Sequence, residues 1–199
     1  MKRAHFGPDF LRFLVDLAAH NDREWFQAHK DRYEMAVRDP FLRFVADPSP
    51  VRGSMMRIYR DIRFSRDKSP YKTAVAAHFP QANPRGQSGP ALYLHLEPGK
   101  SSIGGGIWRP EPPMAKKIRD AIVRDRKRWR QIAFDRTFKS TYTMSGDSLK
   151  RLPRGYDPDD PLADDLKRKD FIVGSRLADH QITSHRFIDF VIDTGPPCL

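Results

Sequence analysis

The spacing of the apolar residues changes twice along this chain, and this change limits the folds that it can adopt. Between Pro8 and Val45 the apolar side chains recur at helical spacing. From Met56 to Trp108 they alternate with polar or small residues, as in strands that bury one face. Helical spacing then returns. Helices followed by strands and again by helices predict an α+β fold with a largely antiparallel sheet, in a single domain over residues 1–199.

The N-terminal helices begin at residues that favour helix starts. Pro8 suits the first turn of a helix that we expect over Pro8–His20. Asn21 or Asp22 can cap a second helix, because their side-chain oxygens accept hydrogen bonds from free backbone N–H groups of the first turn. The pair Asp39-Pro40 predicts a new helix start, and the turn-rich segment DPSPVRG then ends the helical region.

Four segments in the middle of the chain have the alternation of strands, and further elements follow them. The predicted strands cover residues 56–64, 72–79, 91–97 and 101–108. The C-terminal part predicts helices over 114–133 and 161–169, a strand over 138–144, the loop LPRGYDPDDP, and a last helix from about Ser184. The sheet is therefore expected to be a meander that lies between two groups of helices.

Several of these segments carry a family resemblance. They are HNDREWFQAHKDRYE, RIYRDIRFSRDKSPYK, GGGIWRPEP and SGDSLKRLPRGYDPDDPLADDLKRKDF. Together they resemble DUF2461, an uncharacterised family of bacterial and fungal proteins, over most of the chain. The resemblance implies no particular activity. It also implies two departures from the family: a short stretch before RIYRDIRF, and an end at DTGPPCL where relatives continue into another helix, so we expect different C-terminal packing here.

Composition excludes several classes of protein. No apolar run reaches the eighteen or more residues of a membrane span, and the N-terminus has no apolar signal region. The single cysteine, Cys198, leaves no partner for an internal disulfide. We therefore expect a cytoplasmic protein without membrane attachment or structural redox chemistry, and no cofactor is predicted.

The formal net charge of +11 favours anionic partners, because a positive field raises their local concentration. Two stretches carry most of the excess. Residues 57–72 hold six Lys or Arg against two Asp, and residues 116–139 hold ten against three. The charge alone does not choose between small anions, nucleic acids and acidic proteins, so all three remain open.

The alternation also predicts a polar face on the sheet. Small residues lie on the same face as long polar ones, and this combination is typical of a groove that a ligand can enter. The alternative is the ordinary solvated face of an antiparallel sheet. The face is predicted to collect Arg57, Tyr59, Asp61, Arg63, Lys72, His78, Tyr93, His95 and Glu97, with Ala74, Ala76, Gly104 and Gly106 as its small residues.

An anionic or phosphorylated ligand fits this face best, because guanidinium groups pair with carboxylate or phosphate oxygens. The candidate ligand-binding residues are Arg57, Arg60, Arg63, Lys68, Tyr71 and Lys72. Alternatively, Asp61 and Asp67 pair with the arginines as structural ion pairs. Asp61, His95 and Glu97 are candidate acid and base groups. With His78 they could also hold a metal ion, but the spacing is weak support and no metal site is predicted.

The second basic stretch supports an alternative function. Its spacing predicts a helix whose charges surround an apolar stripe, which is usually a solvated surface. It could instead bind a nucleic-acid backbone and stack a base on its tryptophan. The residues concerned are Lys116, Lys117, Arg126, Lys127, Arg128, Trp129 and Arg130. A protein-interaction module with an acidic partner is a third possibility. The chain has no GxSxG, Walker, HExxH or CxxC motif, so no enzyme class is predicted.

Overall fold

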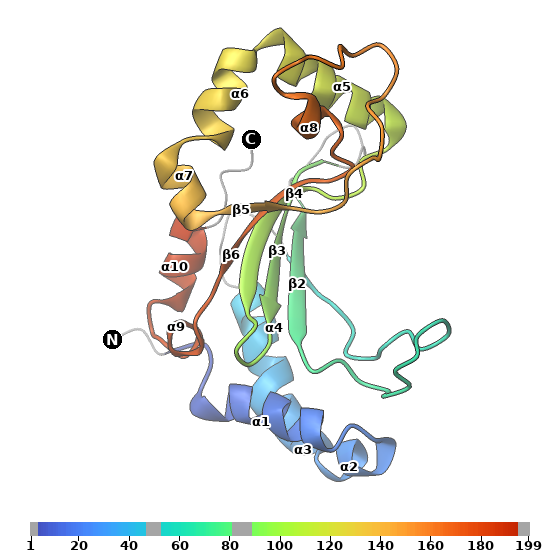
Figure 1. The fold of residues 1–199 in the computed structure, drawn as a ribbon. Helices are drawn as coiled ribbons and strands as arrows, with labels where there is room; N and C mark the ends of the chain where they lie inside the picture. The colour runs from blue at the N-terminus through green and yellow to red at the C-terminus, as the bar shows by residue number, and fades with distance from the viewer. Residues whose placement is uncertain (1–3, 47–52, 81–88, 195–199) are drawn as a thin grey trace. The chain divides into compact units, whose positions relative to one another are not determined.

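The computed structural model describes residues 4–46, 53–80 and 89–194 (Figure 1). Helices come first, a six-stranded antiparallel sheet follows with the order β1-β2-β3-β4-β6-β5, and the chain ends in helices. The predicted α+β class is therefore confirmed. The predicted break at residues 47–52, Cys198 and the end of the chain from residue 195 lie outside the described residues.

The chain forms two compact units. Unit 1 comprises Met1–Pro80, Leu92–Ile103 and Arg176–Gly195, and unit 2 comprises Gln81–Ala91, Gly104–Ser175 and Pro196–Leu199. Each unit is described by itself below. The expectation of a single domain stays a prediction.

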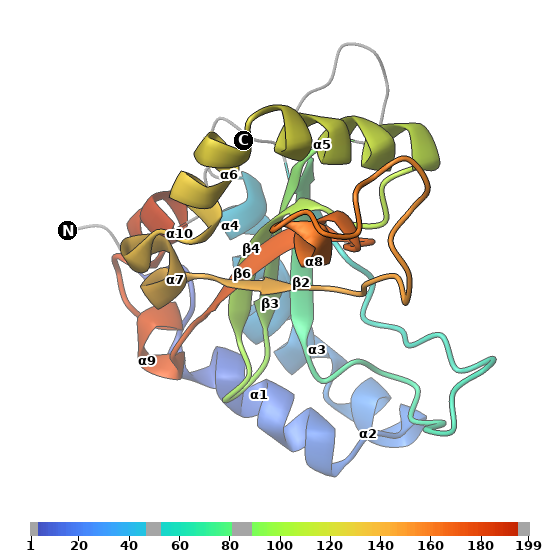
Figure 2. The same cartoon turned by 45° about the horizontal axis from the view of Figure 1, so that its top comes forward.

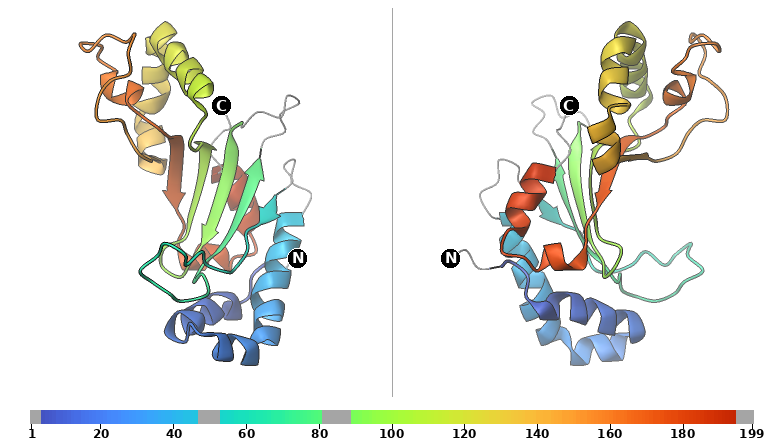
Figure 3. Two further views of the ribbon diagram at one scale, coloured as in Figure 1. Left: turned by 90° about the vertical axis from the view of Figure 1, so that its right-hand side faces the viewer. Right: turned by 60° about the vertical axis from the view of Figure 1, so that its left-hand side comes forward.

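Unit 1 holds the N-terminal helices, three complete or nearly complete strands and the C-terminal helices. Its elements are α1 (Pro8–Ala19), α2 (Arg23–Ala28), α3 (Lys30–Tyr33), the π-helix η1 (Glu34–Arg38), α4 (Asp39–Ala46), β1 (Ser54–Met55), β2 (Val75–Pro80), β3 (Ala91–Leu96), α9 (Asp179–Ile182) and α10 (Phe187–Thr194). Helices α4 and α10 lie on the same side of β2 and β3 (Figure 3). That side carries the core.

Aromatic side chains from distant parts of the sequence build the core of unit 1. The ring of Phe6 lies 4.4 Å from that of Phe10 and 5.7 Å from that of Phe187. All three are fully buried, together with Leu94 and Leu96 of β3. Because each buried aromatic ring removes a large apolar area from water, this cluster dominates the stability of the unit.

The predicted helix starts are confirmed in α1 and α2. Helix α1 begins at Pro8, and Asp22 caps α2 by accepting a hydrogen bond from the Trp25 N–H at 2.8 Å. Helix α4 begins at Asp39, as predicted, but Asp39 does not cap it as was expected. Asp39 has helical dihedral angles, φ −68° and ψ −42°, and the chain continues from η1 into α4 without a break. Proline has no N–H to donate to the preceding turn, and the wider π-turn just before Pro40 accommodates that loss.

The predicted strand over residues 56–64 is also wrong. Only Ser54–Met55 form β1, and the following segment makes a single isolated bridge between Tyr59 and Tyr71. Phe64, expected on the core side, is 96% exposed. The segment hydrogen-bonds with itself: the Arg60 N–H donates to the Pro70 carbonyl and the Lys72 N–H to that of Ile58. Alternation is a local signal and does not reveal whether a partner strand is available.

Unit 2 holds the rest of the sheet and the basic helices. Its elements are the end of β4 (Ser102–Ile107), α5 (Pro112–Arg124), α6 (Arg126–Ala133), α7 (Arg136–Thr141), β5 (Thr143–Ser145), α8 (Ala163–Leu166) and most of β6 (Phe171–Arg176). Strands β5 and β6 pair antiparallel. Figure 2 shows helices α5, α6 and α7 one after another in this unit. A smaller core of Ile122, Leu162 and Leu166 packs with Trp129 and Tyr156.

Three predictions in unit 2 need correction. The helix expected over residues 114–133 divides at Asp125, whose side chain caps α6 by accepting from the Arg128 N–H. The strand expected over 138–144 is mostly helix α7, because Asp135 caps it, and β5 begins only at Thr143. The helix expected over 161–169 is the shorter α8. Strand β6 and, in unit 1, helix α9 were not predicted. None of the described helices is long and apolar enough to cross a membrane.

Candidate functional site

Residues 57–72, here called the signature loop, leave the sheet of unit 1 and return to it. The bridge between Tyr59 and Tyr71 closes the base of the loop. The side chain of Asn21 holds this base from the end of α1, because its Nδ2 donates to the Tyr71 carbonyl at 2.9 Å and its Oδ1 accepts from the Tyr71 N–H at 3.1 Å. The amide therefore pairs with Tyr71 as a neighbouring strand would.

Tyr71 anchors the loop in the core. Its side chain is 2% exposed and its ring stacks on that of Phe26 with the centroids 4.1 Å apart. Burial raises the pKa of the Tyr71 hydroxyl. Tyr71 was predicted to donate a hydrogen bond to an anion, but the structure makes it a packing residue at the base of the loop.

Two arginines of the loop already have carboxylate partners. Arg63 contacts Asp61 through two hydrogen bonds, from Nε at 3.0 Å and from Nη2 at 2.7 Å. Arg60 pairs with Asp67, whose Oδ1 also accepts from the N–H and hydroxyl of Ser69. These contacts match the alternative of structural ion pairs. They leave Arg60 and Arg63 less free to bind an external anion.

The hydrogen bond from Arg63 holds the pKa of Asp61 at about 2. Asp61 is therefore ionised across the neutral range and is a weak proton acceptor there, since an efficient general base has a pKa near the working pH. Asp61 is therefore poorly suited to transfer a proton at neutral pH.

Lys68 contributes to the order of the loop. It donates a hydrogen bond from Nζ to the Ile62 carbonyl at 3.0 Å, which orders the tip of the loop.

Arg57 and Lys72 form a different arrangement, because two positive groups lie close together. Lys72 Nζ donates to the backbone carbonyl of Arg57 at 3.0 Å. Burial, and then the charge of Arg57, lower the pKa of the Lys72 ammonium. Within the described part of the chain, neither side chain forms an ion pair with a carboxylate. Asp61 lies near enough for the charge of Arg57 to help lower its pKa, but it pairs directly with Arg63, so no carboxylate of the described residues contacts Arg57 or Lys72 directly.

The predicted alternation is confirmed for Tyr93–Leu96 of β3, whereas in β2 Ala76, expected on the polar face, is buried, as are its neighbours. Val75, Ala77 and Phe79 are buried on one face with Leu94 and Leu96. On the opposite face Tyr93 is 39% exposed and His95 is half-buried. No helix buries Tyr93 in the core, so the polar face predicted for β3 exists.

Glu97 is the hub of this polar face. His95 Nε2 lies 3.1 Å from Glu97 Oε2, and the Thr73 hydroxyl donates to Glu97 Oε1 at 3.3 Å. Lys100 Nζ lies 3.8 Å from the same Oε1. Thr73 was expected on the core face, but β2 begins only at Val75 and the bend before it turns Thr73 toward Glu97. A carboxylate and an imidazole in contact can exchange a proton with a bound molecule.

The other predicted acid and metal-binding residues do not join this pair. No hydrogen bond or ion pair between described residues links Asp61 or His78 to His95 and Glu97. The described ranges contain no group of three or more His, Cys, Asp or Glu side chains that could hold a metal ion. Asp61 and His78 are therefore not in direct contact with the pair of His95 and Glu97.

The space beside the glycines of β4 is filled by the protein itself. A Cβ atom on Gly104 would lie 2.8 Å from the Val173 carbonyl oxygen, and one on Gly106 would overlap the Phe171 carbonyl oxygen. Both carbonyls belong to β6, the strand that sequence reasoning missed. The room expected for a ligand at these two glycines is therefore taken by a neighbouring strand, which explains why the chain needs glycine there.

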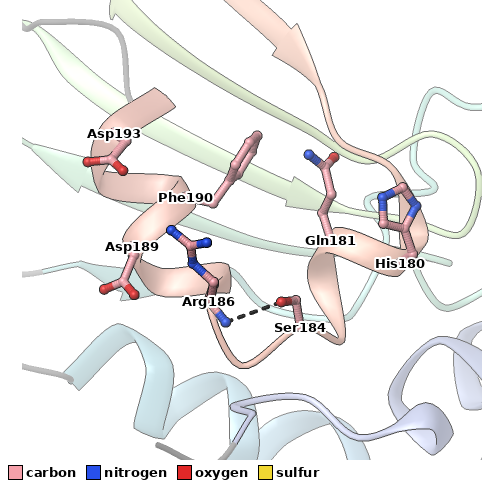
Figure 4. Close-up of a pocket in the computed structure, with 7 residues that line it drawn as sticks. All are labelled: His180, Gln181, Ser184, Arg186, Asp189, Phe190 and Asp193. Carbon is pink, nitrogen blue, oxygen red and sulfur yellow. Dashed lines mark hydrogen bonds between the residues drawn. The ribbon is translucent and has the colours of Figure 1, made fainter.

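A cavity of about 360 Å³ lies elsewhere in unit 1, between α9 and α10 (Figure 4). His180 and Gln181 face Arg186 and Phe190 across it. Asp189 and Asp193 also line the cavity, so its lining carries both negative and positive side chains. None of these residues was predicted as a site, because α9 was not recognised. The mixed charge makes the cavity a poorer anion site than the base of the signature loop.

The structure also places the residues of the nucleic-acid alternative in unit 2. Lys116 pairs with Asp120, and Arg126 pairs with Asp160 at 2.6 Å. Trp129 donates from Nε1 to Asp165 at 2.9 Å and is half-buried against the smaller core, so its ring is not free to stack. The remaining residues of that set are exposed and have no ion-pair partner in the described part of the unit: Lys117, Lys127, Arg128 and Arg130.

Fold and site together define an α+β protein whose antiparallel sheet carries a polar face and a basic, ordered loop. Comparison with protein families assigns it further: residues 9–195 match the family described as Conserved hypothetical protein (DUF2461), and the chain belongs to this family. Comparisons with curated proteins and with solved structures gave no match. The resemblance carried by RIYRDIRFSRDKSPYK and the other segments is thereby confirmed.

Proposed function

We propose that the protein binds a small anionic or phosphorylated ligand at the base of the signature loop, through Arg57 and Lys72. The observation that supports this most is the lowered pKa of Lys72, whose ammonium is partly buried beside Arg57 without a carboxylate partner among the described residues. Two like charges held together are unfavourable by themselves. A phosphate or carboxylate would compensate both at once.

Residues that follow Lys72 in the sequence connect the proposed anion site to the polar face of β3. Thr73 follows Lys72 directly and donates to Glu97, which in turn contacts His95. A ligand held by Lys72 would thus have a carboxylate and an imidazole within the same part of unit 1. This arrangement suits a ligand that combines an anionic group with a hydroxyl or another proton-exchanging group.

The proposal predicts stabilisation by small anions that contain no aromatic base. A ligand at a hundred times its dissociation constant should raise the free energy of unfolding by about 2.7 kcal/mol. Thermal unfolding should be measured with inorganic phosphate, sugar phosphates and di- and tricarboxylates. Arg57→Ala and Lys72→Ala should each abolish most of the shift, because each removes one of the two charges.

Arg43 offers a matched control, since it is an exposed arginine on α4 in the same unit and lies outside the loop. Arg43→Ala should keep the full shift. Equal loss in Arg43→Ala would mean that only the net charge matters. Unchanged shifts in Arg57→Ala and Lys72→Ala would contradict the proposed site.

Affinity for the anion should also depend on pH in the alkaline range. The folded protein lowers the pKa of Lys72, so its ammonium loses the proton at a lower pH than a solvated lysine does. Binding should be constant at neutral pH and should weaken as the pH rises through this lowered pKa. Isothermal titration calorimetry between neutral and alkaline pH measures this. Lys72→Arg keeps its charge throughout, so it should remove the alkaline loss; a wild-type profile in this variant would exclude Lys72 as the titrating group.

The alternative of nucleic-acid binding through residues 116–139 has less support. Trp129 is engaged with Asp165, and two of the cations in that set are paired. The other four cations are exposed, and Trp129 is not free to stack a base beside them. This arrangement is typical of an ordinary solvated helix surface. We therefore do not adopt this region as the site.

A further inference from the structure

A large aromatic side chain is exposed in unit 2 at the turn that follows β4. Trp108 is 65% exposed, although tryptophan has more apolar area to bury than any other residue. The guanidinium carbon of Arg109 lies 4.7 Å from the centroid of the indole. Arg109 has no hydrogen-bonded acceptor for its side chain in the described residues. The guanidinium therefore covers one face of the indole in a cation–π contact, and both groups are exposed, with no carboxylate paired to the guanidinium among the described residues.

The backbone at this turn is strained. Arg109 has φ 47°, and it is the one non-glycine residue with a positive φ in the described part of the chain. This left-handed conformation is unfavourable for residues with a Cβ atom, and it persists only where the surroundings enforce it. Strain of this kind concentrates at ligand-binding positions. The conformation at Arg109 therefore needs a contact that enforces it.

A buried carboxylate enforces the conformation. Asp170 is 3% exposed, and its Oδ1 accepts from the Arg109 N–H at 2.8 Å. Its Oδ2 accepts from the Asp147 N–H at 2.8 Å, so the same side chain also holds the turn at Gly146. Because both oxygens are used, Asp170 fixes the position of the Trp108–Arg109 pair before any ligand arrives.

We propose that Trp108 and Arg109 form a binding platform for a nucleotide unit, either a free nucleotide or one nucleotide of a single-stranded nucleic acid. A base stacks on the exposed indole, and the phosphate accepts hydrogen bonds from the guanidinium. An aromatic surface alone would suit any apolar partner. The adjacent unpaired guanidinium selects a partner that carries a negative charge next to a planar ring.

Phe134 provides a comparison in the same unit. Its ring is also half-exposed, with Lys139 Nζ 4.5 Å from the centroid. Phe134 has neither a positive φ nor a buried carboxylate at its backbone. It therefore shares the exposed ring and the cation but lacks the enforced geometry, which makes Phe134→Ala a matched control.

The test compares ligands with and without a base. Fluorescence anisotropy should follow a labelled oligothymidylate of about 12 nucleotides, within the site sizes of single-strand binding proteins. Calorimetry should follow thymidine monophosphate and ribose 5-phosphate in the Arg57→Ala/Lys72→Ala double variant, because this variant removes the anion site proposed in unit 1, which would bind both phosphates. We expect both base-containing probes, or the oligonucleotide alone, to bind more tightly than ribose 5-phosphate. Binding of thymidine monophosphate by itself indicates a free nucleotide, and binding of the oligonucleotide only indicates a single strand.

Variants then test the platform. Trp108→Ala should weaken binding about 5- to 150-fold, equivalent to about 1–3 kcal/mol for one stacked base. Trp108→Phe should retain most of the affinity and serves if the alanine variant does not fold. Arg109→Gly removes the guanidinium and tolerates the positive φ, so it should weaken binding and reduce its salt dependence. Phe134→Ala should bind as wild type does.

Three results would overturn the proposal: no binding of either base-containing probe, equal affinity for ribose 5-phosphate, or equal loss in Phe134→Ala and Trp108→Ala. The Arg57→Ala and Lys72→Ala variants should keep the part of oligonucleotide or nucleotide binding that depends on Trp108. This platform is therefore testable independently of the anion site in unit 1.

Discussion

Asp170→Ala should lower the free energy of unfolding by about 3–6 kcal/mol, because hydrogen bonds to a charged group contribute about 1.5–3 kcal/mol each. The variant leaves the N–H groups of Arg109 and Asp147 without their acceptor. It also opens a space against Gly146, which packs on the Asp170 side chain. Urea unfolding followed by circular dichroism measures the change, and Asp170→Asn should lose about half as much because its amide oxygen still accepts one bond.

Asp159→Ala is the matched control for this experiment. Asp159 lies in the same unit and is exposed, and its carboxylate makes no hydrogen bond or ion pair with the described residues. Its removal should change stability by less than about 0.5 kcal/mol, as surface substitutions usually do. A loss below about 1 kcal/mol in Asp170→Ala would show that the two turns keep their conformation without the carboxylate, and would remove its role in positioning Trp108.

Gly106→Ala should have an effect of similar size, about 2–6 kcal/mol. A side chain at φ 126° costs about 1–3 kcal/mol, and forcing atoms into a filled space adds about 1–3 kcal/mol. The new methyl group would overlap the Phe171 carbonyl oxygen, so β4 and β6 must separate locally. Hydrogen exchange of the β6 amides should accelerate in this variant while that of β2 stays unchanged.

A graded series tests the cause. Gly104→Ala meets the Val173 carbonyl oxygen at 2.8 Å but has no positive φ, so its cost should be intermediate. Gly7→Ala places its Cβ where no atom lies within 4 Å, and it should change stability by less than about 1 kcal/mol. Equal effects in all three variants would mean that the general flexibility of glycine, and not the approach of β6, determines the result.

Local patterns were enough to predict much of the framework. The faces of β3 follow from alternation, and the contact of His95 with Glu97 follows from their spacing of two residues on one strand face. The start of α1 at Pro8 and the cap of α2 at Asp22 are also local signals. The family resemblance rested on segments that are continuous in the sequence, so the chain itself contains all that is needed to recognise it.

Features that depend on distant partners could not be predicted. The signature loop alternates like a strand, but its base pairs with Asn21, a contact that no pattern in residues 57–72 contains. Strand β6 is half-buried at every position except its last, so it has no alternation to detect. Because β6 was missed, Gly104 and Gly106 were interpreted as room for a ligand. The platform at Trp108 was missed as well, since exposure and backbone strain are properties of the folded chain.

The contact of Phe187 with Phe6 has a consequence for biosynthesis. A ribosome adds residues from the N-terminus at about 5–20 per second, and α1 to α4 emerge long before α10 is made. Until then the aromatic side chains that finally surround Phe187, including Phe6 and Phe44, lack one wall of their core. Most of the described part of unit 2 forms one stretch from Gly104 to Ser175, so this unit can complete most of its own contacts first. During synthesis, the N-terminal helices are therefore the part of the nascent chain that most needs protection by chaperones.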